Sequence, residues 1–131
     1  MSAIHRSIVK TADAPQAIGP YSQAIKTDTL VFVSGQIALA PATGSMVDSD
    51  IRAETRQAMT NLAAVLTAAG SSIENVVKAT LFIRNMDDFA MINEVYGEFF
   101  PSDPPARACV EVSRLPKDAR VEVECIALLS R

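Results

Sequence analysis

The chain has 131 residues and a mass of 14.0 kDa, which suits one domain, residues 1–131, with a core of ordinary size. A composition of 49% hydrophobic and 21% charged residues with a net charge of -3 excludes a low-complexity chain and gives no general attraction to phosphate backbones or anionic lipid, so we expect neither nucleic acid nor a membrane as the partner. The sequence has no apolar run of about 18 residues and no apolar signal core near its start, which predicts a protein of the reducing cytoplasm.

The first half of the chain predicts strands followed by a helix. Residues 21–25 and 30–37 have strand character, and the second run is interrupted by Gly35, which indicates a buried strand that another group approaches closely at that position. From Asp50 the apolar residues recur at helical spacing until Gly70, the expected C-terminal cap.

The second half predicts a strand, a helix and a pair of strands. Residues 76–83 form a short β-branched run, typical of a central strand. Phe89, Ile92, Tyr96 and Phe99 then repeat at helical spacing, with Asn85 or Asp87 as N-cap. The prolines at 101, 104 and 105 end this helix.

Residues 106–113 and 120–128 alternate like strands on either side of a turn at 114–119, which predicts an antiparallel hairpin. The element order indicates an α+β domain with two layers, in which both helices cover one face of a mixed, mostly antiparallel sheet. A neighbouring subunit is the natural cover for the other face, so we expect a cyclic homo-oligomer.

The hairpin also carries the residues best suited to chemistry. If its two strands pair symmetrically, Arg107 and Cys109 share a face with Glu122 and Glu124. An arginine fork suits a carboxylate, and a nearby glutamate can activate water, which is enough for hydrolysis of a small acid. The alternative is a cross-strand ion pair on a solvated surface.

Other candidate residues support less chemistry. His5 is the only histidine, and Cys109 and Cys125 lack the CxxC spacing, so we predict a site without a metal and treat Cys109 as a structural thiol. Tyr21 follows a Gly-Pro turn that fixes its direction. Its side chain either donates to a ligand or packs in the core.

Several segments, taken together and in order, closely resemble the RidA/YjgF family of reactive-imine deaminases. These segments are 18–24, 33–37, 105–112, 115–117 and 121–124. The resemblance implies a fold like that of chorismate mutase, assembled as a homotrimer with clefts between subunits. It also implies hydrolysis of 2-imino acids, such as 2-iminobutanoate and 2-iminopropanoate, to 2-oxo acids and ammonia without a cofactor.

Carried over by position, the resemblance assigns Arg107 to the substrate carboxylate and Glu122 to the reacting carbon, with Tyr21 orienting the substrate. The other residues that it places in the same cleft are Ser34, Gly35, Asn93 and Cys109.

Two other functions stay open at this stage. A protein that binds 2-oxo acids without turnover would use the same Arg107 cleft. An endoribonuclease or translation inhibitor is the second alternative. The negative net charge and the lack of a histidine in the cleft give this second alternative little support.

Overall fold

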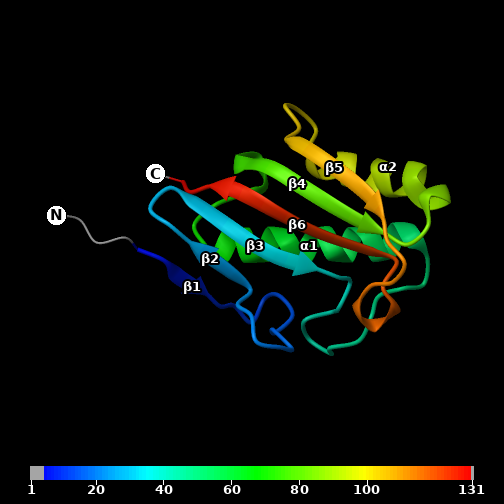
Figure 1. Cartoon of the computed structure of the whole chain (residues 1–131), viewed down its shortest axis with the longest axis horizontal. Helices are drawn as coiled ribbons and strands as arrows, with labels where there is room; N and C mark the ends of the chain where they lie inside the picture. The colour runs from blue at the N-terminus through cyan, green and yellow to red at the C-terminus, as the bar shows by residue number, and fades with distance from the viewer. Residues whose placement is uncertain (1–4, 131) are drawn as a thin grey trace.

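The computed structural model of the protein describes residues 5–130. In that range one six-stranded sheet, with strand order β1-β2-β3-β6-β4-β5, is covered on one face by two α-helices (Figure 1). The strands are β1 (Ser7–Val9), β2 (Ala24–Lys26), β3 (Leu30–Gln36), β4 (Val76–Ile83), β5 (Ala106–Glu111) and β6 (Val121–Leu128). The helices are α1 (Ile51–Ala68) and α2 (Phe89–Phe99), with short 3₁₀ turns η1 (Ile73–Asn75), η2 (Met86–Asp88) and η3 (Pro116–Asp118).

The strand pairing confirms a mixed, mostly antiparallel sheet. β5 runs parallel to β4, whereas every other neighbouring pair among the described strands is antiparallel. The expected hairpin of residues 106–113 with 120–128 is wrong, because β4 lies between β5 and β6. The physical reason is the connection through α2, a crossover that returns the chain to the start of β4 and makes β5 parallel to it.

β6 occupies an interior position between β3 and β4 (Figure 1). Every second residue of this strand, from Val121 to Ala127, is buried. An interior position satisfies the backbone of such a strand on both sides, which the edge of the sheet would not do.

The two helices form where the apolar spacing predicts them. Asp50 caps α1, since its Oδ1 accepts a hydrogen bond of 2.8 Å from the Ala53 amide. Gly70 follows the helix with φ of 83°, a left-handed conformation that favours glycine. Asn85 caps the 3₁₀ turn η2 and not α2 itself.

The core lies between the helices and the covered face of the sheet. Its largest fully buried apolar side chains come from α1, α2, β3, β4 and β6: Met59, Leu62, Leu66, Leu81, Ile83, Ile92, Val31, Val65, Val95, Val121 and Val123. In the described residues, no helix combines the length and apolar character needed to cross a membrane.

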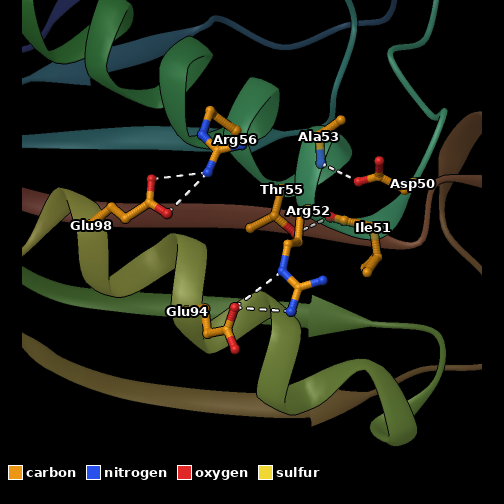
Figure 2. A network of polar contacts seen from close by, with 8 residues as sticks. All are labelled: Asp50, Ile51, Arg52, Ala53, Thr55, Arg56, Glu94 and Glu98. Carbon is orange, nitrogen blue, oxygen red and sulfur yellow. Dashed lines mark hydrogen bonds and ion pairs between the residues drawn. The ribbon is translucent and has the colours of Figure 1, made fainter.

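Two ion pairs join the outer surfaces of the helices, as Figure 2 shows. Arg52 and Arg56 of α1 lie 3.0 Å from Glu94 and Glu98 of α2, respectively. All four side chains are about half exposed or more, so each pair stabilises the fold by at most about 1 kcal/mol. Their matching spacing of four residues along both helices follows one face of each helix.

The opposite face of the sheet carries exposed apolar side chains and is uncovered by any described helix. Phe32, Val110 and Leu128 are each more than 40% exposed. The register places all three on the same face as Ile126 and Phe82. This uncovered sheet face is the surface for which the sequence predicts a neighbouring subunit.

A buried carboxylate ties α1 to the start of β6. Glu54 is only 1% exposed, and its two oxygens accept hydrogen bonds from the backbone amide and the Nε of Arg120 at 2.6 and 2.7 Å. Arg120 also donates to the Asp48 carbonyl at 3.0 Å. This contact fixes the backbone two residues before Glu122.

We predict that Glu54→Ala lowers the free energy of unfolding by about 3 kcal/mol or more, because the guanidinium and the backbone amide of Arg120 lose their hydrogen-bond acceptor. Glu94→Ala, which breaks an exposed ion pair with Arg52, should cost at most about 1 kcal/mol. Urea unfolding at one fixed protein concentration measures both variants. Equal losses would show that Glu54 contributes no more than a surface charge.

Candidate functional site

The predicted site residues form two groups on opposite sides of the sheet. Arg107, Asn93 and Cys109 lie near β5 and α2, whereas Tyr21, Gly35 and Glu122 lie around a cavity that β3 and β6 border. Ser34 precedes Gly35 on β3.

Arg107 is half-buried and held against α2. Its Nη1 donates a hydrogen bond of 2.7 Å to the Asn93 side-chain carbonyl. Its Cζ lies 5.6 Å from the Phe89 ring centroid and 4.9 Å from that of Tyr96. Among residues 5–130 no carboxylate forms an ion pair with Arg107, so the other donors of its fork suit an external carboxylate.

Cys109 lies two residues further along β5 on the same face. Burial raises the pKa of its thiol, and the charge of Arg107 offsets this only in part. The thiol therefore stays protonated near neutral pH and forms part of the wall beside Arg107, as expected for a structural cysteine.

Glu122 lies at a cavity of about 290 Å³ bordered also by Tyr21, Gly35, Gln36 and Pro116. Burial, followed by the charge of Glu124, raises the pKa of Glu122 above the usual range of a glutamate. A raised pKa near a cavity is typical of a group that exchanges protons.

Gly35 gives Glu122 its space. A Cβ at position 35 would come 2.7 Å from Oε2 of Glu122. The close approach predicted from the glycine in this strand is therefore confirmed, and the approaching group is the Glu122 carboxylate.

Tyr21 borders the same cavity, and Ser34 holds the segment that carries Tyr21. Tyr21 is 49% exposed, so the alternative that it packs in the core is wrong. Ser34 Oγ donates a hydrogen bond of 2.6 Å to the Ser22 carbonyl, which ties β3 to the segment that carries Tyr21.

The expected shared face for Arg107 and Glu122 is wrong. Arg107 and Cys125 both pair with Ala79, whereas Glu122 and Val110 both pair with Phe82. Because side chains alternate along β4, Arg107 lies on the helix-covered face and Glu122 on the uncovered face. A cross-strand ion pair between them is excluded for the same reason, and one chain does not bring both groups to one small molecule.

Sequence reasoning missed the aromatic surroundings of Arg107. Phe89 and Tyr96 were predicted only as an apolar helix stripe, yet both rings contact Arg107. Their separation from Asn93 by four and three positions was the available signal.

In the part of the chain that the structure describes, no three His, Cys, Asp or Glu side chains gather as a metal site would require.

Comparisons with known proteins agree with the motifs in the sequence. The family model described as Endoribonuclease L-PSP matches residues 11–129. A 2-iminobutanoate/2-iminopropanoate deaminase of Bos taurus is 47% identical over 128 residues, covering 98% of this chain and 93% of the relative. The chain belongs to the RidA/YjgF family. The resemblance predicted from sequence is thus confirmed.

The chain is also similar to an archaeal protein and to a solved crystal structure. A RutC family protein of Pyrococcus horikoshii is 50% identical over 122 residues, covering 93% of this chain and 97% of the relative. The crystal structure of E. coli TdcF with bound serine has a TM-score of 0.91 at 44% identity and covers 95% of this chain and 99% of that chain. The family model is described as an endoribonuclease, whereas the bovine relative is named a deaminase. Membership of the family therefore does not by itself determine which of these activities the chain has.

We predict that Gly35→Ala displaces the Glu122 carboxylate while the fold is retained. The new Cβ would meet the flexible end of Glu122 and not the backbone, so the cost in stability should not exceed about 1–3 kcal/mol. Gly97→Ala on α2 is the control, because a Cβ there meets no atom of the described residues within 4 Å. Crystal structures of both variants test this, and an unmoved Glu122 in Gly35→Ala would contradict it.

Proposed function

We propose that this protein is a deaminase that hydrolyses small 2-imino acids to 2-oxo acids and ammonia without a cofactor. The main support is Arg107, a half-buried arginine whose hydrogen-bond partner is a neutral amide, since such a cation suits the carboxylate of an imino acid. The name of the bovine relative supports the same reaction class. TdcF holds serine in its crystal structure, and serine likewise has a carboxylate next to the carbon that bears nitrogen.

We further propose that the active unit is a homotrimer with its sites between subunits. The uncovered sheet face exposes Phe32, Val110 and Leu128, and burial of this apolar surface favours association. Arg107 and Glu122 lie on opposite faces of the sheet in one chain. A neighbouring copy that brings its Glu122 cavity to the Arg107 group of the first would complete a site.

In this proposal Arg107 binds the substrate carboxylate through its free donors and fixes the orientation of the imine. Glu122 accepts a proton from a water molecule while the water oxygen bonds to the imine carbon. Return of this proton to the nitrogen gives a tetrahedral adduct that carries a hydroxyl and an amine. Transfer of the hydroxyl proton to the amine through Glu122 then breaks the C–N bond, which releases ammonia and leaves the carbonyl of the 2-oxo acid.

The remaining predicted residues orient the substrate or shape the site. The exposed Tyr21 hydroxyl donates to the ligand, and the Gly35 backbone approaches it closely. Ser34 and Cys109 form the wall, the former by holding the Tyr21 segment through Ser22. Asn93 lines the site beside Arg107.

Two rival functions predict different measurements. A 2-oxo acid sensor would bind its ligand through Arg107 without accelerating imine hydrolysis. An endoribonuclease would cleave RNA independently of Arg107, although Glu122 lies in a cavity with no histidine among its lining residues. Turnover, ligand binding and RNA cleavage by one purified sample therefore separate the three functions.

We predict that Arg107→Ala lowers kcat/KM for imine hydrolysis at least about 100-fold, because charge-assisted hydrogen bonds to the substrate are lost. Glu122→Gln should lower kcat by a factor of about 10²–10⁴ with a smaller effect on KM. The assay follows 2-oxo acid release from a serine or threonine dehydratase with and without the protein. Full activity in either variant would remove that residue from the reaction.

The raised pKa of Glu122 predicts the pH dependence of turnover. Glu122 accepts a proton only when ionised, so kcat/KM should fall as pH falls through a pKa above the usual glutamate range. Glu124→Gln removes one of the two causes of the rise and should move this acidic limb to lower pH. If the fall of kcat/KM occurs at the same pH in Glu124→Gln, the titrating group is not Glu122.

A further inference from the structure

One face of α2 is built around the Arg107 guanidinium. Phe89, Asn93 and Tyr96 lie four and three positions apart, the spacing that brings side chains to one side of a helix. The two rings lie 5.6 and 4.9 Å from the Arg107 Cζ, and the Asn93 carbonyl accepts the Nη1 hydrogen bond at 2.7 Å. Three contacts from one rigid helix therefore set both the position and the plane of the guanidinium.

The partners of Arg107 differ from those of other arginines in this chain. Four other arginines each bond a carboxylate within 3.0 Å: Arg52, Arg56, Arg114 and Arg120. Arg107 instead has an amide and two aromatic rings. Asparagine accepts a hydrogen bond from the guanidinium without neutralising its charge.

Tyr96 also brings no charge close to the Arg107 guanidinium. Its hydroxyl is buried and has no hydrogen-bond partner among residues 5–130, and burial raises its pKa, so the phenol stays protonated over the physiological range. The ring packs against Phe100 with a centroid distance of 4.8 Å. Packing, and not a hydrogen bond of the hydroxyl, therefore fixes the ring beneath Arg107.

We propose that Phe89, Asn93 and Tyr96 form a neutral cradle that positions Arg107 and leaves its full positive charge for a ligand carboxylate. Asn93 is then a positioning residue that acts through Arg107 and not a residue that binds the substrate directly. This inference rests on the proposed function for the identity of the ligand, and it refines the role of Asn93 there.

Asn93→Asp is the most direct test, because it keeps the shape of the side chain and places a negative charge beside Nη1. We expect the affinity for 2-oxobutanoate, measured by calorimetry on the full chain, to fall at least about tenfold, since the new carboxylate pairs with the guanidinium. Imine turnover should show the same loss mainly in KM. Ala90→Asp adds the same charge at an exposed position of α2 and should leave both values near those of the unmodified protein.

Asn93→Ala tests the positioning without any ligand. NMR signals of the Arg107 guanidinium should report restricted rotation at Nη1 in the unmodified protein and faster rotation in Asn93→Ala. Unchanged guanidinium dynamics in this variant, or undiminished 2-oxobutanoate affinity in a folded Asn93→Asp, would overturn the cradle. Binding of 2-oxobutanoate without imine turnover in the unmodified protein would contradict the proposed function while the cradle still stands.

Discussion

The alternation of side chains across β4 is the constraint on which the account of this protein depends. β4 separates β5 from β6, and the register pairs Ala79 of β4 with Arg107 and Phe82 with Glu122, an odd number of positions apart and therefore on opposite faces. No side-chain rotation carries a group through a hydrogen-bonded sheet. The two residues that the family resemblance assigns to one reaction therefore belong to different surfaces of the chain, which is why we propose a site completed by a second copy.

The same arrangement keeps the positive charge of Arg107 apart from the carboxylate of Glu122 within one chain. Arg107 and Glu122 on one face of a single chain would form an ion pair, which would satisfy the arginine and lower the pKa of the glutamate. Apart, Arg107 keeps its charge against the neutral face of α2, and burial raises the pKa of Glu122. In the proposed homotrimer, a carboxylate ligand and a water molecule would occupy the space between the Arg107 of one copy and the Glu122 of its neighbour.

Local sequence signals predicted the helices and several single residues well. Apolar periodicity and the cap at Asp50 determined α1, and Gly35 within a strand indicated the close approach that Glu122 makes. The pairing of residues 106–113 with 120–128 was wrong because pairing depends on distant parts of the chain. The crossover through α2 and the buried alternation of β6 decided it. Phe89 and Tyr96 looked like ordinary core residues, since only the structure shows that Arg107 lies over them.

Mixing two inactive variants tests the central claim of a site shared between chains most directly. Arg107→Ala and Glu122→Gln chains are unfolded together, refolded as hybrids, and assayed for imine hydrolysis, with native mass spectrometry to verify that hybrids form. If sites lie between subunits, some boundaries combine an intact Arg107 from one chain with an intact Glu122 from its neighbour, and activity returns. Hybrids that form but remain as inactive as the separate variants would contradict a shared site.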